Sequence, residues 1–270
     1  MRIAIFGGSF NPPHLGHIQA ARAAAEQLSA EKLIVMPTAK SPHKPEAPQS
    51  PQPEGRLSLT KLAFSDVAGA KVSDMEIIRG GKSFTADTLE ELYSIYPEGE
   101  FFLLIGSDML KSFESWSRFE SILSLATLGV FKRENEDTQK LAQICERLQR
   151  LYGAKTIIID HEPIVISSTE LRQLLARRQG NELLPEPVYA EIIKKRYYNA
   201  KPNLDWLRTA VLPYIKEKRV AHVLGCEQEA VRLAKHWGAD PELAAEAGLL
   251  HDITKKQDGE SQLKLCGHYG

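Results

Sequence analysis

Residues 1–17 combine a short apolar run with a segment rich in glycine and proline that ends in two histidines. Residues 3–6 read Ile-Ala-Ile-Phe, and residues 7–17 read Gly-Gly-Ser-Phe-Asn-Pro-Pro-His-Leu-Gly-His. Four consecutive apolar residues are typical of a strand that is buried on both faces. Gly7 and Gly8 permit a tight turn and a close approach of the backbone to a ligand. This order predicts a buried strand, a glycine turn and a helix.

The predicted helix begins with features that favour anion binding. Pro12 and Pro13 suit its first turn, because proline fixes φ and the first N–H groups of a helix have no helical partner. Those free N–H groups and the helix dipole attract anions. His14 and His17 are three residues apart and therefore share one face, with Gly16 leaving space for a flat ligand. The segment predicts a site for the phosphates of a nucleotide.

The first two thirds of the chain alternate apolar runs with amphipathic segments, which predicts an α/β fold with a doubly wound parallel sheet and right-handed crossovers. The predicted strands are residues 3–6, 33–36, 101–105, 128–131 and 156–159. The predicted helices are residues 14–28, 56–67, 86–96, 118–125 and 137–151. In such a sheet, ligands bind at the carboxyl ends of the strands, where the glycine turn lies.

Two stretches interrupt this alternation. Residues 38–54 contain five prolines, which predicts a long loop near the site. Near residue 200 the pattern changes, and the later periodic segments are all helical: residues 206–216, 222–237 and 241–250. We therefore expect a domain over residues 1–199 and a small all-α domain over residues 200–270.

Composition limits the classes of partner. The chain has 34 Lys and Arg against 35 Asp and Glu, so no global field favours nucleic acid or a membrane surface. No apolar run approaches the roughly 20 residues that span a bilayer, and the N-terminus enters a strand without a signal peptide. Cys145, Cys226 and Cys266 are few and widely spaced, which favours a reducing cytoplasm. The oligomeric state, a homo-oligomer included, stays open.

A second motif, Ile-Ser-Ser-Thr-Glu-Leu-Arg, occupies residues 166–172. Ser167 and Glu170 have the spacing of a capping box, which predicts the start of another helix. Ser168 and Thr169 add hydroxyl groups there, and Arg172 follows one turn later. Arginine contacts phosphate oxygens bidentately, so this second helix start suits a triphosphate.

Together these residues resemble the nucleotidyltransferases that carry a His-x-Gly-His motif. In that family the histidines bind ATP phosphates and stabilise charge during transfer, and an Ile-Ser-Ser-Thr-x-x-Arg element also binds ATP. The resemblance implies catalytic residues His14, His17 and Arg172. It implies that ATP is bound by Gly7, Gly8, Ser9, Phe10, His14, His17, Gly106, Asp108, Ser167, Ser168, Thr169 and Arg172.

Three further stretches resemble nicotinate-mononucleotide adenylyltransferases: residues 41–44 (Ser-Pro-His-Lys), 83–89 (Ser-Phe-Thr-Ala-Asp-Thr-Leu) and 105–108 (Ile-Gly-Ser-Asp), with Trp116 following. That family joins AMP from ATP to nicotinate mononucleotide, giving deamido-NAD and pyrophosphate in NAD biosynthesis. The resemblance implies substrate contacts from Lys44, Thr85, Asp108 and Trp116. ATP would bring Mg²⁺, held mainly by phosphates and water.

Other functions stay open at this point. Phosphopantetheine adenylyltransferases share the first motif, although their chains are usually shorter and their late motif resembles Ser-Ser-x-x-x-Lys. A preference for nicotinamide mononucleotide depends on groups that the sequence does not identify. A nucleotide-binding sensor without catalysis is disfavoured because both histidines and Arg172 are present.

The C-terminal part resembles HD-domain metal phosphohydrolases, most of all small bacterial proteins that hydrolyse diadenosine tetraphosphate. His222 and the adjacent pair His251-Asp252 carry the resemblance, which implies that they bind a transition metal such as iron or manganese. That family has further ligands, including a distal aspartate, beyond the point that corresponds to Gly270. We therefore expect an incomplete HD domain, with dinucleoside polyphosphate hydrolysis as an alternative second activity.

Overall fold

The computed structural model describes residues 1–41, 49–132, 138–161, 164 and 166–269. Its internal contacts divide the chain into two compact units, Met1–Ala200 and Lys201–Gly270, here called unit 1 and unit 2. The predicted motifs of the first two thirds all fall in unit 1, and His222, His251 and Asp252 fall in unit 2.

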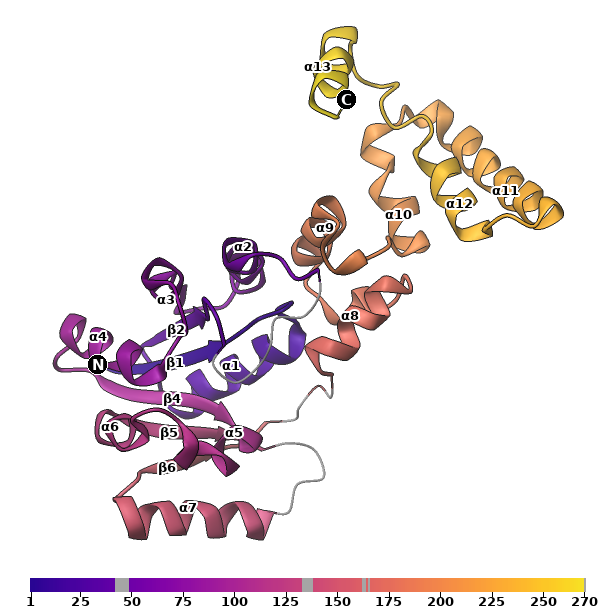
Figure 1. Cartoon of the computed structure of the whole chain (residues 1–270). Coiled ribbons are helices and arrows are strands. Elements are labelled where there is room, and N and C mark those ends of the chain that lie inside the picture. The colour runs from indigo at the N-terminus through magenta and orange to yellow at the C-terminus, as the bar shows by residue number, and fades with distance from the viewer. Residues whose placement is uncertain (42–48, 133–137, 162–163, 165, 270) are drawn as a thin grey trace. The chain divides into compact units, whose positions relative to one another are not determined.

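Unit 1 is built on a parallel sheet with the strand order β3-β2-β1-β4-β5-β6 (Figure 1). Its strands in the described residues are β1 (Arg2–Gly8), β2 (Lys32–Pro37), β3 (Ala70–Val72), β4 (Glu100–Gly106), β5 (Ala126–Phe131) and β6 (Thr156–Ile159). The predicted doubly wound parallel sheet is confirmed. Strand β3 was not predicted, because it has three residues and the exposed Lys71 interrupts its apolar character.

The helices of unit 1 follow the expected alternation. They are α1 (Leu15–Gln27), α2 (Pro53–Ala63), α3 (Met75–Arg79), α4 (Thr85–Ile95), α5 (Ser107–Lys111), α6 (Phe119–Leu125), α7 (Thr138–Tyr152), α8 (Ser168–Ala176) and α9 (Glu186–Lys195). Helices α3 and α5 were not predicted, because five residues are too few to show a helical period. Helix α9 was also missed.

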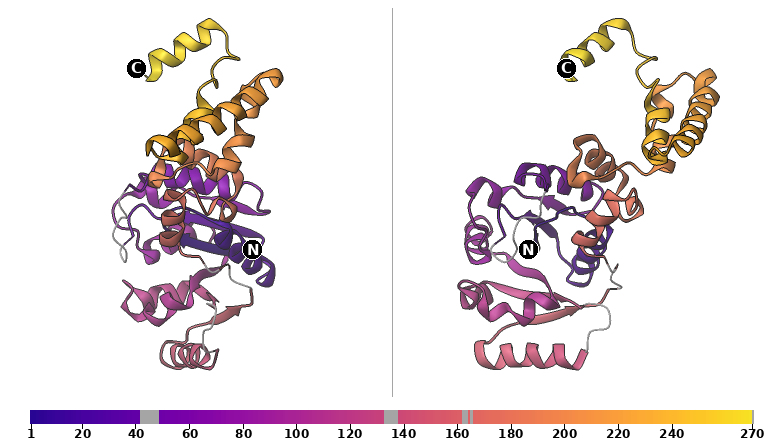
Figure 2. Two further views of the ribbon diagram at one scale, coloured as in Figure 1. Left: turned by 90° about the vertical axis from the view of Figure 1, so that its right-hand side faces the viewer. Right: turned by 45° about the vertical axis from the view of Figure 1, so that its right-hand side comes forward.

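Both faces of the sheet are covered, and the views in Figure 2 show helices on either side of it. Alternate strand residues, among them Ile3, Ile5 and Leu103, pack on one face with side chains of α4, α5, α6 and α7. Their neighbours Ala4 and Phe6 point to the other face and are also buried. This double burial explains why the strands read as apolar runs.

Strand β1 pairs with β2 on one side and with β4 on the other, so the strand order reverses between β1 and β4. The segments that follow β1 and β4 therefore diverge from the same edge of the sheet. Open α/β sheets bind ligands in the crevice at such a reversal. The first motif follows β1, and the 105–108 stretch begins within the end of β4.

Unit 2 is helical in its described residues, with α10 (Leu204–Ala210), α11 (Val220–Trp237), α12 (Pro241–Leu250) and α13 (Gly259–Tyr269). A small apolar core joins α10, α11 and α12 through Leu207, Val223 and Leu249. The prediction of one helix over residues 206–216 was wrong. Helix α10 ends at Ala210, and a short 3-10 turn over Leu212–Tyr214 follows, because Pro213 has no N–H for an α-helix.

We predict that Gly248→Ala destabilises unit 2. A Cβ at Gly248 would lie 2.7 Å from Glu227 Cα and 2.9 Å from Glu227 N, so α12 would have to move away from α11. Overpacking of this kind costs about 1–3 kcal/mol. Urea unfolding followed by far-UV circular dichroism measures the change.

Gly225→Ala is the matched control, because a Cβ there meets no atom within 4 Å and Gly225 lies in α11, the helix against which Gly248 packs. Alanine is the better helix former by about 0.5–1 kcal/mol, so this variant should gain stability. Equal effects of the two substitutions would contradict the close packing of α11 on α12.

Candidate active site

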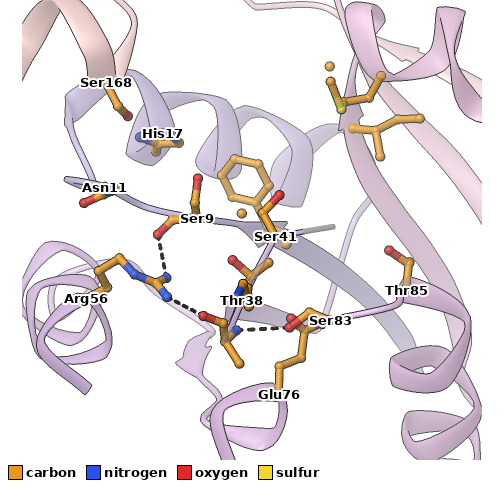
Figure 3. Close-up of a pocket in the computed structure, with 18 of the residues that line it drawn as sticks. Ser9, Asn11, His17, Thr38, Ser41, Arg56, Glu76, Ser83, Thr85 and Ser168 are labelled. Atoms are coloured by element: carbon orange, nitrogen blue, oxygen red, sulfur yellow. Dashed lines mark hydrogen bonds between the residues drawn. The ribbon is translucent and has the colours of Figure 1, made fainter. Parts of the chain in front are cut away.

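A pocket of about 1090 Å³ lies in unit 1 at the carboxyl ends of β1 and β4. Segments far apart in the sequence line it, and Figure 3 shows part of its wall. They lie within residues 6–17, 38–41, 50–56, 76–85, 103–109, 115–122 and 166–172. The part of residues 38–54 that the structure describes before α2 therefore borders the site, as predicted.

The pocket gathers most of the site residues that the sequence suggested. Those that line it are Gly7, Gly8, Ser9, His14, His17, Thr85, Gly106, Asp108, Trp116, Ser167, Ser168, Thr169 and Arg172. Phe10 does not line it: the side chain is 1% exposed and packs edge-on against Phe6 and Phe64. Phe10 therefore supports the wall from behind. Lys44 lies outside the described residues.

The two histidines meet at the start of α1. The helix begins at Leu15, one residue after the predicted start, because His14 is extended at φ −143° and caps the helix, and Pro12 and Pro13 precede it. The His14 N–H donates to His17 Nδ1 at 3.2 Å, and the two ring centroids are 3.7 Å apart. The predicted common face is confirmed.

The glycines of the first motif differ from the sequence interpretation in one respect, because Gly7 and Gly8 belong to a strand and form no turn. Gly7 and Gly8 are the last residues of β1, and neither has a positive φ. A Cβ on Gly7 would meet no atom within 4 Å, so its absence leaves the backbone open to the pocket. A Cβ on Gly16 would lie 3.1 Å from His14 Nδ1. Gly16 therefore makes room for the His14 ring, and its predicted role beside a flat ligand stays a prediction.

Helix α8 brings a second N-terminus to the pocket. The predicted capping box is confirmed: Glu170 N donates to Ser167 Oγ at 3.1 Å, and Ser167 N donates to Glu170 Oε2 at 2.9 Å. Arg172 Nη1 donates to the Asn11 carbonyl at 2.7 Å, and Ser168 Oγ donates to the Pro12 carbonyl at 3.3 Å. These bonds hold the start of α8 against the segment before α1.

Arg56 is a structural member of the site that the sequence interpretation missed. Its guanidinium donates to the Ser9 carbonyl at 2.9 Å and to the Ala39 carbonyl at 2.8 Å (Figure 3). Ala39 N in turn donates to Ser83 Oγ at 3.0 Å. Arg56 thereby joins the segments after β1 and β2. The sequence did contain a signal for this role. Arg56 lies on the buried face of α2 with Leu59, and an arginine that faces the core needs hydrogen-bond partners.

Several buried polar atoms of the pocket wall have no partner among the described residues. They are Asn11 Oδ1, His14 Nδ1, Thr38 Oγ1 and Glu76 Oε2. A buried polar atom without a hydrogen bond costs about 1–3 kcal/mol, so such atoms gathered at one cavity favour a polar ligand. The sequence interpretation missed Thr38 and Glu76. Burial raises the pKa of Glu76, although hydrogen bonds from Ser83 and Thr88 act against this.

The charges of the wall favour a phosphate-bearing ligand. Lys40, Lys82, Arg56 and Arg172 line the pocket beside the two histidines, whereas Glu76 and Asp108 are its carboxylates. Phosphate oxygens bind well to such cations and to helix N-termini. Asp108 folds back over the end of β4, where a Cβ on Gly106 would lie 2.5 Å from Asp108 Oδ1. The carboxylate thus lies beside the glycine at the end of β4.

Unit 2 brings together the three residues predicted to bind a metal. His222 Nε2 lies 3.3 Å from His251 Nε2, and Asp252 oxygens lie 3.3 Å from His251 Nε2 and 3.6 Å from His222 Nε2. Asp252 is 1% exposed and pairs with Lys255 and Arg219. The hydrogen bond from Lys255, followed by that from Arg219, lowers the pKa of Asp252 to about 2.

Comparison with known families matches both units. The cytidylyltransferase-like family matches residues 5–174, and the HD domain family matches residues 219–268. Two proteins called probable nicotinate-nucleotide adenylyltransferase are similar over unit 1. The protein of Lachnoclostridium phytofermentans is 36% identical over 73% of this chain and 98% of its own length. The protein of Clostridium acetobutylicum is 34% identical over 72% of this chain and 98% of its own length.

Solved structures share the fold of unit 1. The nicotinic acid mononucleotide adenylyltransferase of Plasmodium falciparum, complexed with NaAD, has a TM-score of 0.61 at 17% identity. The match covers 74% of this chain and 98% of that one. Separately, no helix within the described ranges has both the length and the apolar character needed to cross a membrane.

We predict that acidification destabilises unit 1 through His14, which is 6% exposed. Burial lowers the pKa of His14 from 6.5 to about 4, so between these values the unfolded chain binds the proton more readily. The folded state therefore loses about 2 kcal/mol by about pH 5 and about 3 kcal/mol below about pH 4.

Urea unfolding of the wild type and of His14→Asn, at about pH 7.5 and about pH 5, measures the contribution of His14 to the free energy of unfolding. The wild-type free energy of unfolding should fall by about 2 kcal/mol more than that of the variant. Equal losses in the two proteins would show that His14 is not the titrating group.

Proposed function

The chain belongs to the nicotinate-nucleotide adenylyltransferases of the cytidylyltransferase-like family, and from this premise we propose how its pocket carries out the reaction. The enzyme transfers AMP from ATP to nicotinate mononucleotide, giving deamido-NAD and pyrophosphate in NAD biosynthesis. The observation that carries our assignment of the site is the meeting of two helix N-termini, those of α1 and α8, at one pocket.

We assign the ATP triphosphate to these two helix starts. His14 and His17 offer ring nitrogens, and burial lowers the pKa of His14 so that its ring is neutral at neutral pH in the ligand-free pocket. Ser168 and Thr169 add hydroxyl groups. The Arg172 guanidinium has five N–H groups, and its bonds to Asn11 and Thr169 leave others for phosphate oxygens.

The remaining ATP contacts follow from the pocket wall. We propose that the backbone of Gly7, Gly8 and Ser9 approaches the nucleotide, since no atom lies within 4 Å of the position that a Cβ on Gly7 would take. Gly106 and Asp108 close the other strand end, with Asp108 placed to accept hydrogen bonds from ribose hydroxyls. Ser167 acts through its capping bond with Glu170.

We assign nicotinate mononucleotide to the part of the pocket formed by Thr85, Asp108 and Trp116. Figure 3 draws Thr85 on the side of the pocket away from Ser168. The Trp116 indole, whose ring centroid lies 5.2 Å from that of Phe113, offers a face for the pyridine ring. Lys44 remains a proposed phosphate contact that lies outside the described residues.

The reaction needs alignment more than proton transfer. A phosphate oxygen of nicotinate mononucleotide attacks the α-phosphorus of ATP, a new P–O bond forms, and the bond to the β-phosphate oxygen breaks to release pyrophosphate. The attacking oxygen is already ionised, so no general base is required. Catalysis therefore consists of holding both phosphates in line and stabilising the charge that develops, through His14, His17 and Arg172.

Divalent metals enter at two places. Mg²⁺ would arrive with ATP and would neutralise part of the phosphate charge, held by phosphates and water because the described residues of the pocket form no carboxylate cage. In unit 2 we propose a transition metal, iron or manganese in the first instance, held by His222, His251 and Asp252. Hydrolysis of a dinucleoside polyphosphate there is the second candidate activity, supported by the closeness of these three side chains.

We propose a cytoplasmic enzyme, in line with its free cysteines, whose partners are ATP and nicotinate mononucleotide, without nucleic acid or membrane. The homo-oligomeric state stays open. Phosphopantetheine and nicotinamide mononucleotide are the competing acceptors.

We predict pyrophosphate release from ATP and Mg²⁺ with nicotinate mononucleotide, and much less with nicotinamide mononucleotide or phosphopantetheine. His17→Ala should lower kcat by about 100- to 1000-fold, as loss of a group that stabilises developing charge does, with little change in KM for nicotinate mononucleotide. Steady-state kinetics of pyrophosphate release measures both values.

Release with phosphopantetheine alone, or the absence of release with any of the three acceptors, would contradict the assigned reaction. An unchanged kcat with a raised KM for ATP in His17→Ala would reduce His17 to a binding residue. Cys266→Ser, in unit 2, is the matched control and should leave the kinetics unchanged.

A further inference from the structure

A cysteine lies beside the two histidines of unit 2. His222 and Cys226 are four residues apart on α11, so they share one face of the helix. His251 is the residue directly after α12, and its ring lies beside that of His222. One ligand atom from each of the three residues lies within 4.8 Å of the other two. Cys226 Sγ is 3.6 Å from His222 Nε2, and His222 Nε2 is 3.3 Å from His251 Nε2.

These two separations match two edges of a tetrahedral metal site. With Zn–N bonds of about 2.05 Å and a Zn–S bond of about 2.3 Å, tetrahedral angles place two nitrogens about 3.3 Å apart and a sulfur about 3.6 Å from a nitrogen. The observed 3.3 Å and 3.6 Å agree with both values. Two of the three edges therefore already have the length that a bound ion requires, and the three ligand atoms all lie within 4.8 Å of one another.

The surroundings also orient the ligands. His251 Nδ1 lies 2.7 Å from the Gly248 carbonyl, and a carbonyl can only accept, so Nδ1 carries a proton and Nε2 is the nitrogen that can bind a metal. Gly248 itself packs against the backbone of Glu227 next to Cys226, which fixes the distance between α11 and α12. Figure 1 shows these two helices side by side, as their shared core requires.

Asp252 is less free to serve as the charged ligand than an HD pattern suggests. Its carboxylate pairs with Lys255 Nζ at 2.7 Å and with Arg219, so two cations already share its charge. A divalent ion at the histidines would therefore gain from another anionic group. Cys226 is half-buried at this place and becomes anionic when its thiol loses a proton.

We propose that Cys226 is a thiolate ligand that completes, with His222 and His251, a site for a borderline-soft divalent ion such as zinc. The inference rests on the proposed metal binding by His222 and His251, and it alters the expected metal. On binding, the Cys226 thiol releases its proton to solvent, and Asp252 or a water takes the fourth position. Thiolate and imidazole ligands together favour zinc over iron(II) or manganese(II).

Cobalt(II) titration of the full chain tests this, because a thiolate bound to cobalt gives a charge-transfer band in the near ultraviolet. The wild type and Cys266→Ser, which removes an exposed thiol, should both show the band. Cys226→Ser should lose it. Competition with a zinc chelator should show that Cys226→Ser also loses zinc affinity by more than the roughly 10- to 100-fold typical of an outer-shell partner.

The outcomes separate the two proposals. Cobalt bound without the charge-transfer band, with equal affinity in the wild type and Cys226→Ser, would overturn the thiolate ligand and leave metal binding by the histidines intact. No binding in the wild type would overturn both. If Cys226→Ser fails to fold, alkylation of the wild type decides: zinc should protect Cys226 and not Cys266, and equal reactivity with and without zinc would overturn the proposal.

Discussion

The bond from Arg172 to the Asn11 carbonyl is the contact on which the active site depends. It spans 161 positions of sequence at 2.7 Å, and the Ser168–Pro12 bond reinforces it. Through these bonds the N-terminal ends of α1 and α8 face one pocket. One helix start binds an anion weakly; two of them, with two histidines and an arginine, can hold the several charges of a triphosphate. The parallel sheet makes this meeting possible, because its strands end at one edge.

The sequence revealed the parts of this arrangement that local chemistry determines. Residues 3–6 are apolar because β1 is buried on both faces, so the strand was evident. Ser167 and Glu170 form a capping box whose bonds lie within four residues, and its structure matches the prediction. The three-residue spacing of His14 and His17 likewise placed their rings together.

What the sequence did not reveal depends on partners far along the chain. Arg56 joins Ser9 to Ala39, and no local pattern shows where a buried arginine finds its acceptors. The missing Cβ of Gly16 also accommodates the His14 ring, and this contact depends on the extended backbone before α1. Cys226 was not recognised as a metal ligand, because the second histidine beside it, His251, lies at the end of another helix. The residues that carry a family resemblance were thus easier to find than those that position them.

The central claim is that the starts of α1 and α8 form one triphosphate site. A crystal structure of the full chain with a non-hydrolysable ATP analogue and Mg²⁺ tests it most directly. We expect the triphosphate between the two helix starts, with phosphate oxygens in hydrogen-bond contact with His17, Ser168 and Arg172. A triphosphate bound instead beside Thr85 and Trp116, with Arg172 still joined only to Asn11 and Thr169, would contradict the claim.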